Sequence, residues 1–429
     1  MSRLRFFNAN IITMADGFNV LKDGVLTVED ERISYVGDIA GEPDGIKYDR
    51  EIDAAGNIIM PGFKNAHTHS GMTFLRSYAD DLPLERWLNE SIFPREAKLR
   101  DNDIYWCTKL AVMEYLTSGI TACFDMYLRP YEIARATEEC GFRCVQVGSM
   151  NNFSQSLELQ EEWLNNLNGA NPLTSYMLGY HAEYTCSKEL LEGLSDLAHK
   201  YKVPVWGHNS ETEAEVRGCI ERNGMTPTEF ADSLGLYDNG GGGYHCVHMS
   251  DRDFEIFKKR GLYAVTNPGS NVKLASGMAP VSRFVKEGIG VAIGTDGPAS
   301  NNCLDMFREI FLTAALPKLR ENDASAMDAN NVLYMATTGG AKAMGLKDSD
   351  VLACGKYADL IMIDMTKPEM QPLCNLTKNI VYSGSKADIK LTMVAGKILY
   401  EDGRFNIGES PETIIKEVNR INKEIGDIS

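Results

Sequence analysis

Two histidines, His67 and His69, are separated by one residue directly after a short apolar run. In extended backbone, residues two apart place their side chains on one face, so both imidazoles can bind the same metal ion. The pair alone is equally compatible with surface histidines or with hydrogen-bonded core histidines. With His208 as a third nitrogen ligand and Asp296 as an oxygen ligand, the set becomes typical of zinc or another divalent ion with room for a water. The alternative, that all four are structural, requires several buried polar side chains to find other partners.

Two further residues could move protons beside such an ion. Glu211 follows His208 by three residues, and it is either a solvated carboxylate in the first turn of a helix or a proton carrier facing the metal. His245 is either a hydrogen-bonded core histidine or a group that polarises an oxyanion or the attacking water. We interpret His248 as structural because strand alternation turns it to the other side, and His199 as structural because it lies in a helical pattern.

Eight short apolar segments alternate with helical segments between about residues 60 and 350, which predicts βα units and a parallel sheet. The candidate strands are 57–63, 120–126, 143–150, 175–182, 203–208, 243–248, 262–267 and 290–296. Eight units in about 240 residues favour a TIM barrel, and no G-x-G-x-x-G motif opens a helix after a strand. Five of the seven histidines and Asp296 fall at the carboxyl ends of these strands, where barrel enzymes carry their active sites.

Both ends of the chain show a different texture, with short alternating strands separated by Gly and Asp turns. We therefore predict an α/β protein in which a (β/α)8 barrel over 59–350 carries a small β-sandwich domain built from 1–58 and 351–429. Residues 411–428 predict a closing amphipathic helix. The four glycines at 240–243 lack the Lys-Ser/Thr of a phosphate loop, and we interpret them as a flexible connection.

Composition excludes several classes of partner. The formal charge of −17 comes without a Lys/Arg run, so binding to nucleic acid or to an anionic membrane has no visible basis. No signal-peptide pattern and no apolar stretch of membrane-spanning length is visible, which predicts a soluble cytoplasmic protein. The ten cysteines form no C-x-x-C pair and fit reduced thiols. A homo-oligomer is expected only by analogy with other barrels.

The chain resembles the amidohydrolase superfamily, in particular its S-adenosylhomocysteine/5-methylthioadenosine deaminase-like branch, which is related to the cytosine and guanine deaminases. The resemblance covers essentially the whole chain and rests on "PGFKNAHTHSGMTFLRSYADDLPLERWL", "HNSETEAEV", "HCVHMS", "TNPGSNVKLASGMAPV" and "GTDGPASNN", in this order. It implies a single Zn, or Fe, held by His67, His69, His208 and Asp296. No lysine occurs in 175–182 to bridge two metals, so the mononuclear form is implied.

The resemblance also implies the chemistry. Asp296 would act as the base on the attacking water, Glu211 would protonate the ring nitrogen beside the amino-bearing carbon, and His245 would stabilise the tetrahedral intermediate. Collapse of that intermediate would expel ammonia. A metal ion lowers the pKa of a water towards ~7, which supplies a nucleophile at neutral pH.

Substrate contacts follow from the same resemblance. Trp87, Glu96 and His181 match positions that meet the base and the ribose in adenosine-type deaminases, although Trp87 could equally be a packing anchor. Members that act on S-adenosylhomocysteine carry arginines after the third strand, but no Arg occurs between Arg143 and Arg217 here. A tail carboxylate would therefore lose its bidentate partner. The expected substrate is a small aminated N-heterocycle, such as a 5′-modified adenosine, another purine or a pterin.

Two other functions remain open on the sequence. A triazine-type hydrolase would keep the metal and displace chloride or an alkylamine. A barrel without catalysis would only bind a ligand or support an assembly, but it would not need an acid, a base and a metal on one rim. The sequence leaves undecided the role of Asp125 and that of Thr266, which stands where His is common in the family.

Overall fold

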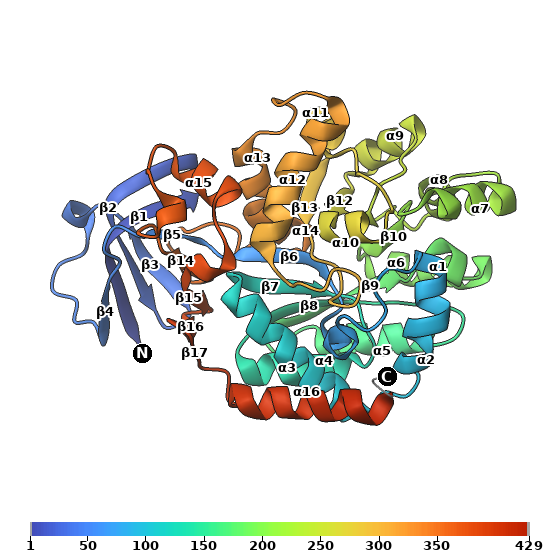
Figure 1. The fold of residues 1–429 in the computed structure, drawn as a ribbon, viewed down its shortest axis with the longest axis horizontal. Coiled ribbons are helices and arrows are strands. Elements are labelled where there is room, and N and C mark those ends of the chain that lie inside the picture. Colours follow the sequence, from blue (N-terminus) through green and yellow to red (C-terminus); the bar gives the residue numbers. More distant parts are fainter. Residues whose placement is uncertain (1, 427–429) are drawn as a thin grey trace.

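The computed structural model describes residues 2–426 and consists of a parallel barrel beside a sheet built from both ends of the chain (Figure 1). The barrel strands follow one another in sequence order around the sheet. They are β6 (Phe63–Thr68), β7 (Ile120–Asp125), β8 (Arg143–Val147), β9 (Thr174–Tyr180), β10 (Val205–Asn209), β11 (Gly241–His245), β12 (Tyr263–Thr266) and β13 (Gly290–Ile293). The predicted eight-stranded barrel is confirmed.

The first and last barrel strands meet through hydrogen bonds beyond the regular pairing. The backbone N–H of Asp296 donates to the carbonyl of His67 at 3.0 Å. Asn65 Nδ2 donates to Thr295 Oγ1 at 2.7 Å, and Asn65 Oδ1 accepts from the Thr295 N–H at 2.9 Å. These bonds hold two of the predicted metal ligands against each other where the barrel closes.

Helices surround the barrel and begin and end at capping residues. Ser187 accepts a hydrogen bond from the Leu190 N–H at the start of α6, and Gly141 and Gly261 end α4 and α9 in the left-handed conformation. The helices are α3 (Asp101–Thr117), α4 (Pro130–Cys140), α5 (Leu157–Leu167), α6 (Lys188–Tyr201), α7 (Glu213–Asn223), α8 (Pro227–Ser233), α9 (Asp251–Arg260), α10 (Pro268–Lys273), α11 (Val281–Lys286), α12 (Met306–Glu321), α13 (Ala329–Tyr334) and α14 (Gly340–Ala343).

Short helical turns cover the carboxyl ends of the barrel strands. The segment after β6 contains η2 (Ser70–Leu75), α1 (Leu84–Arg86), η3 (Trp87–Ile92) and α2 (Phe93–Glu96), and η4 (Glu183–Thr185) follows β9. The other short turns are η1 (Ile39–Gly41), η5 (Met335–Gly339), η6 (Pro368–Met370) and η7 (Lys386–Asp388). The segment after β6 brings residues that follow the histidine pair over the mouth of the barrel.

The second sheet is mixed and draws on both termini, in the order β17-β16-β15-β14-β5-β1-β2-β3 with β4 beside β1. Its strands are β1 (Arg3–Met14), β2 (Gly17–Glu29), β3 (Arg32–Gly37), β4 (Arg50–Asp53), β5 (Ile58–Pro61), β14 (Leu360–Ile363), β15 (Ile389–Val394), β16 (Lys397–Glu401) and β17 (Arg404–Phe405). Residues from both ends, such as Phe6, Leu26, Leu360 and Leu391, share one apolar core. The predicted small β domain formed from both termini is therefore confirmed.

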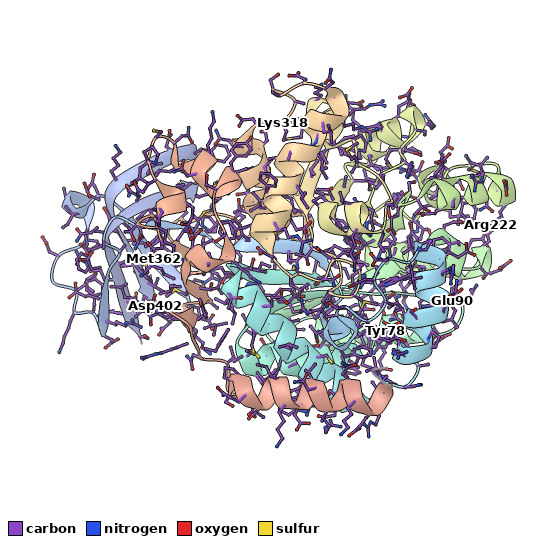
Figure 2. All side chains as sticks on the ribbon, viewed as in Figure 1. Tyr78, Glu90, Arg222, Lys318, Met362 and Asp402 are labelled. Atoms are coloured by element: carbon purple, nitrogen blue, oxygen red, sulfur yellow. The ribbon has the colours of Figure 1, made fainter. Side chains whose placement is uncertain are left out.

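Two helices complete the C-terminal part, α15 (Leu376–Tyr382) and α16 (Pro411–Ile425). The latter lies along α3 at the outside of the barrel (Figure 1). The last residues of the predicted closing helix lie outside the described residues. Figure 2 shows the side chains on this frame, with the exposed Arg222 and Asp402 on the outer surface and the buried Met362 in the terminal sheet.

The structure corrects two sequence-based predictions. The run 57–63 is not the first barrel strand, because β5 pairs with β1 and β14 in the terminal sheet and the barrel begins with β6. The glycines at 240–243 are not a flexible connection, because Gly241–Gly243 form most of β11 and are buried. A Cβ on Gly242 would lie 2.2 Å from the Tyr263 carbonyl oxygen, so the neighbouring strands exclude a side chain there. The domain limits remain a prediction.

A buried ion pair links the two parts of the molecule. Arg143 on β8 donates from Nε to Asp359 Oδ2 at 2.7 Å, and Asp359 Oδ1 also accepts from the Ala395 N–H at 2.7 Å. The Arg143 side chain is 4% exposed and that of Asp359 is fully buried. Across residues 2–426, no helix has the length and apolarity needed to cross a membrane.

Candidate active site

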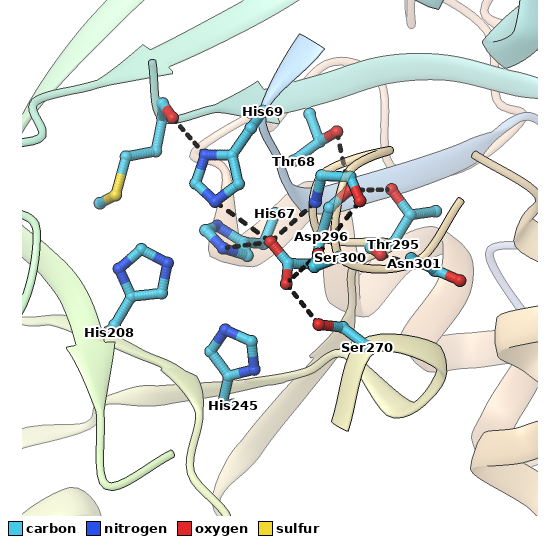
Figure 3. A network of polar contacts seen from close by, with 12 residues as sticks. His67, Thr68, His69, His208, His245, Ser270, Thr295, Asp296, Ser300 and Asn301 are labelled. Atoms are coloured by element: carbon cyan, nitrogen blue, oxygen red, sulfur yellow. Dashed lines mark hydrogen bonds and ion pairs between the residues drawn. The ribbon is translucent and has the colours of Figure 1, made fainter. Parts of the chain in front are cut away.

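The four predicted metal ligands meet at the carboxyl end of the barrel. His67 lies near the end of β6, His69 just after it, His208 on β10, and Asp296 after β13. Asp296 Oδ1 is 3.1 Å from His69 Nε2 and 3.6 Å from His67 Nε2. One ligand atom from each of His67, His69 and Asp296 lies within 4.8 Å of the others, and the same holds for His67, His208 and His245. Figure 3 shows these four rings around the Asp296 carboxylate.

Backbone carbonyls orient two of the rings. His69 Nδ1 hydrogen-bonds the Met126 carbonyl oxygen, and His208 Nδ1 hydrogen-bonds that of His181 at 2.6 Å. A ring that donates from Nδ1 to a carbonyl keeps its Nε2 lone pair free for a metal. In that tautomer both rings would present Nε2 to a metal ion.

The His67 ring fits the same purpose. It is fully buried and stacks on Tyr244 with 3.8 Å between ring centroids. Neither of its nitrogens has a hydrogen-bond partner among the described residues. Burial, reinforced by His69 and His208, holds the pKa of His67 well below its usual value, so the ring is neutral. A buried neutral imidazole without a partner is what a metal ligand requires before the ion is bound.

Asp296 is held in place by donors that the sequence analysis did not single out. Its Oδ2 accepts from Ser270 Oγ at 2.6 Å and from Ser300 Oγ at 2.7 Å, while its Oδ1 accepts from the Gly297 N–H at 2.7 Å. Burial opposes the charge, but His69 and His245 outweigh it and hold the pKa of Asp296 well below its usual range. Its backbone has a φ of 59°, a left-handed conformation that non-glycine residues adopt mainly where the surroundings impose it.

Glu211 and His245 form the opposite wall. His245 Nε2 is 3.8 Å from Glu211 Oε2, and Ser276 Oγ donates to Glu211 Oε1 at 3.2 Å. Burial raises the pKa of Glu211 above its usual value, which shifts its balance towards the protonated acid. Glu215 accepts from the Glu211 N–H at 2.7 Å and fixes the backbone there. His245, with a φ of 70°, contacts Asn271 Oδ1 through Nδ1 at 2.7 Å.

A cavity of about 510 Å³ opens in front of these groups. Trp87 on η3, Glu96 on α2 and His181 after β9 line it, together with Glu211, His245 and Asp296. His69 and His208 also reach the cavity. The structure thus brings every predicted site residue to one place, with His67 in the wall of buried residues behind the others.

The predicted substrate contacts differ in character. Burial raises the pKa of Glu96, and Tyr127 lies beside its carboxyl group. Burial lowers the pKa of His181 to about 4, so this ring is neutral. Trp87 is 4% exposed and also belongs to the main apolar core, so it both packs and lines the cavity.

The remainder of the cavity wall is mainly apolar. The segment after β8, which contains no arginine, contributes neutral residues, and Phe153 from it contacts Phe93 edge to face at 5.6 Å. The lining includes Leu84, Leu88, Phe93, Phe153, Leu159 and Trp163. Arg129 is the one Lys or Arg among the described lining residues, and its Nε pairs with Asp101 at 3.2 Å. The sequence analysis missed Arg129 because it considered arginines only in the segment after the third barrel strand, β8, whereas Arg129 follows the second, β7.

The remaining residues considered in the sequence lie outside the cavity lining. His248 Nε2 contacts the Ser276 carbonyl oxygen at 2.7 Å, and His199 on α6 pairs with Asp238 at 2.9 Å. Thr266 is buried at the end of β12. Asp125 accepts from the Ser70 N–H at 3.0 Å and lies behind the histidine pair.

A nearly closed barrel with histidines and an aspartate at the carboxyl ends of its strands, beside a buried acid, is the arrangement of a metal-dependent hydrolase. The chain belongs to the amidohydrolase family, whose sequence profile matches residues 58–399. Members of this family act on C–N bonds by hydrolysis, and the chain is a hydrolytic enzyme of this kind.

Curated relatives cover almost the entire chain. A protein of Thermoanaerobacter pseudethanolicus named 5-methylthioadenosine/S-adenosylhomocysteine deaminase is 40% identical over 405 residues, or 92% of this chain and 93% of that protein. A protein of the same name from Pelotomaculum thermopropionicum is 37% identical over 435 residues, or 98% of this chain and 100% of that protein. The resemblance noted in the sequence is therefore confirmed.

Solved structures agree in fold. An adenosine deaminase from Xanthomonas campestris with bound zinc has a TM-score of 0.94 at 30% identity, covering 99% of this chain and 98% of that one. A zinc-complexed atrazine chlorohydrolase from Arthrobacter aurescens has a TM-score of 0.89 at 21% identity, covering 98% and 100%. At that identity the second likeness shows the fold alone.

Proposed function

We propose that the protein is a hydrolytic deaminase of an adenosine-type nucleoside whose 5′ substituent is neutral, and that it releases ammonia. The observation that carries this proposal is the convergence of Glu211, His245 and Asp296 with His69 and His208 on one cavity, with His67 directly behind them. The names of the relatives at 37–40% identity support the substrate class.

We propose one divalent ion per chain, zinc in preference to iron, held by His67, His69, His208 and Asp296. When bound, the ion would act as a Lewis acid that lowers the pKa of a water towards ~7. Imidazole nitrogens and a carboxylate oxygen are donors that suit zinc. The unpartnered nitrogens of buried His67 support the assignment.

The surrounding residues would divide the proton transfers. Asp296 takes a proton from the attacking water, and Glu211, whose pKa is raised by burial, delivers a proton to the ring nitrogen beside the amino-bearing carbon. His245 stabilises the charge that develops on the new oxygen substituent. The tetrahedral intermediate then loses its amino group as ammonia, so the amino-heterocycle and one water become the oxo-heterocycle and ammonia.

Substrate would lie along the cavity from the histidines towards its apolar wall. Trp87 would pack against the base, Glu96 would accept hydrogen bonds from the ribose hydroxyls, and His181 would contact the nucleoside. The apolar wall suits a thioether or another neutral 5′ group. A carboxylate-bearing tail has only Arg129 available among the described lining residues, and that guanidinium already pairs with Asp101.

Ammonia release across a panel of compounds tests the proposal. The panel contains 5′-methylthioadenosine, adenosine, S-adenosylhomocysteine, guanine, cytosine, a pterin and an aminotriazine. We expect the highest kcat/KM with 5′-methylthioadenosine or adenosine and a lower value with S-adenosylhomocysteine. Halide or alkylamine released from triazines, without ammonia from any amino-heterocycle, would transfer the assignment to a triazine-type hydrolase.

Metal analysis tests the ligand set separately. The purified protein should contain about one equivalent of divalent ion at this site. His67→Ala should remove that equivalent and abolish ammonia release, while the matched change His199→Ala on exposed α6 should do neither. Unchanged activity in His67→Ala would refute the ligand assignment.

We further propose a cytoplasmic protein with small-molecule substrates and, by analogy with other barrels, a homo-oligomeric state, without nucleic-acid or membrane partners. The acidic net charge of −17 is the observation behind the last of these. Light scattering of the purified protein would measure the oligomeric state directly.

A further inference from the structure

A second group of metal-ligating side chains lies outside the catalytic cavity. Cys123 and Asp125 on β7 face the same side as Cys144 on β8, because strand alternation turns Phe124 and Val145 into the barrel interior instead. Cys123 and Cys144 are direct partners in the register of the two strands. All three side chains are fully buried between the strands and the packed helix α3.

The spacing of the two sulfurs suits an ion. Cys123 Sγ and Cys144 Sγ are 3.6 Å apart. A tetrahedral ion with sulfur ligands at about 2.3 Å places two sulfurs about 3.8 Å apart. One ligand atom from each of Cys123, Asp125 and Cys144 lies within 4.8 Å of the others.

Asp125 supplies an independent indication of a missing partner. Its Oδ1 accepts from the Ser70 N–H at 3.0 Å, but its Oδ2 is buried and has no hydrogen-bond partner among the described residues. A buried carboxylate oxygen without a partner is costly, and such an atom in a native structure points to an unseen ligand. Two buried thiols alone could be ordinary core residues. What distinguishes this group is that the carboxylate beside the thiols has one buried oxygen without a partner among the described residues.

We propose that Cys123, Cys144 and Asp125 form a second, thiolate-rich metal site that binds Zn²⁺. Two sulfurs and one carboxylate form a donor set suited to a borderline-soft ion. Binding of the ion requires each thiol to lose one proton, so two protons pass to solvent for each Zn²⁺ bound when Asp125 is already ionised. Ser70, whose side chain interacts with Cys123, offers an oxygen for a fourth position.

The site would stabilise the catalytic rim without taking part in the reaction. Asp125 holds the backbone of Ser70, which directly follows His69. Ser70 Oγ and Thr68 Oγ1 both lie 2.8 Å from the Tyr115 hydroxyl, so the strand end that carries the histidine pair is anchored to α3 at the same place. An ion bound by β7 and β8 would hold this anchor together. The inference shares no ligand with the catalytic site and does not depend on the proposed function.

Cadmium provides a selective probe for the full-length protein. Thiolate-to-cadmium charge transfer absorbs in the ultraviolet, whereas the proposed catalytic ligands contain no sulfur. To remove competing thiols, the measurement uses a variant in which the four cysteines with solvent exposure are replaced by Ser, namely Cys186, Cys303, Cys354 and Cys374. We expect two cadmium equivalents per chain, the charge-transfer band, and a ¹¹³Cd resonance in the thiolate range, and we expect added Zn²⁺ to abolish the band.

Three further variants identify the ligands. In that same background, Cys123→Ser/Cys144→Ser should lose the band and one cadmium equivalent, while the matched buried pair Cys107→Ser/Cys140→Ser should keep both. His67→Ala should keep the band, which separates this site from the catalytic one. If the Cys123→Ser/Cys144→Ser variant does not fold, the parent variant still decides. A folded parent protein without thiolate-bound cadmium, or with a band that Zn²⁺ does not displace, would overturn the proposal.

Discussion

At the scale of single residues, the site works by placing groups with opposed protonation preferences on one cavity. Burial favours the protonated acid at Glu211, while the contacts of Asp296 keep its carboxylate ionised. An acid and a base whose environments separate their pKa values can act in the same reaction at one pH. The division of roles between Glu211 and Asp296 therefore follows from their surroundings, since their side chains are chemically alike.

Glu211→Gln tests the acid. Gln cannot donate the proton to the ring nitrogen, so kcat/KM should fall by about 10²–10⁴, with the metal content unchanged. In the wild type the acid works only while it is protonated, so kcat/KM should decline as the pH rises through the raised pKa of Glu211. This alkaline limb of the pH profile should be missing in the Glu211→Gln variant. The exposed change Glu213→Gln on α7 is the control. A variant that keeps the alkaline limb would assign it to another group.

Ser270→Ala and Ser300→Ala test the support of the base. Each change removes one donor to Asp296 Oδ2, and hydrogen bonds to charged groups contribute about 1.5–3 kcal/mol. We expect kcat to fall by about tenfold in each single variant and by more in the double variant, with KM nearly unchanged. Ser282→Ala, whose buried hydroxyl donates to Glu321, should leave both constants unchanged. Equal effects on KM and kcat would instead indicate a disturbed cavity.

At the scale of elements, the sequence predicted the types of most strands and helices but not all of their neighbours. The alternation of short apolar segments with helical segments is a local signal, and the structure confirms those elements. The run around Ile58 has the pattern of a buried strand, but no local signal tells which of two sheets it joins. Likewise, Ser270 and Arg129 lie far in the sequence from the residues that they join at the site, so spacing alone could not reveal them. Ser300 lies only four residues after Asp296, but its serine type gave no signal of a role.

The glycine-rich strand β11 offers a test at this scale. Gly242→Ala should destabilise the protein by about 1–3 kcal/mol, because its Cβ would meet the Tyr263 carbonyl at 2.2 Å and the Trp206 ring at 2.5 Å. Gly218→Ala is the matched control, since the nearest atoms to its Cβ belong to the end of the long Arg222 side chain, and Ala should stabilise helix α7 by about 0.5–1 kcal/mol. Thermal unfolding measures both. A Gly242→Ala variant as stable as the wild type would mean that the strands can separate locally.

Glu309 on α12 predicts a pH dependence of stability. Burial raises its pKa from 4.5 to about 8, while its oxygens accept from the Gly269 N–H and Asn301 Nδ2, both at 2.8 Å. A carboxyl group with a raised pKa in the folded state stabilises the protein at acid pH, and this contribution is lost as the pH rises through about 8.

The variant Glu309→Gln isolates that contribution. Its overall stability should be lower because one hydrogen-bond acceptor is lost. Between pH 5 and 9, however, its free energy of unfolding should change by on the order of a few kcal/mol less than that of the wild type. The exposed change Glu213→Gln should leave the wild-type pH dependence intact. Parallel pH profiles for Glu309→Gln and the wild type would contradict the assignment.

At the scale of the whole molecule, the terminal sheet and the barrel are joined by polar as well as apolar contacts. Thr392 Oγ1 on β15 donates to the Leu116 carbonyl on α3 at 2.7 Å, and the Arg143 and Asp359 side chains meet in the buried junction. β8 carries Arg143 at its start, on the side of the barrel opposite the cavity. The terminal sheet therefore supports the end of the barrel away from the site.

Asp359→Asn tests how strongly this junction depends on its ion pair. Asn keeps the size of the side chain but leaves the Arg143 guanidinium buried without a counter-charge, which should cost about 3–5 kcal/mol. Amide exchange should rise first in β14 and β15, because Asp359 also accepts from the Ala395 N–H and immediately precedes β14. The exposed pair of Glu161 and Lys200 provides the control, since Glu161→Gln should cost no more than about 1 kcal/mol. If both changes lower stability equally, the apolar contacts alone hold the sheet to the barrel.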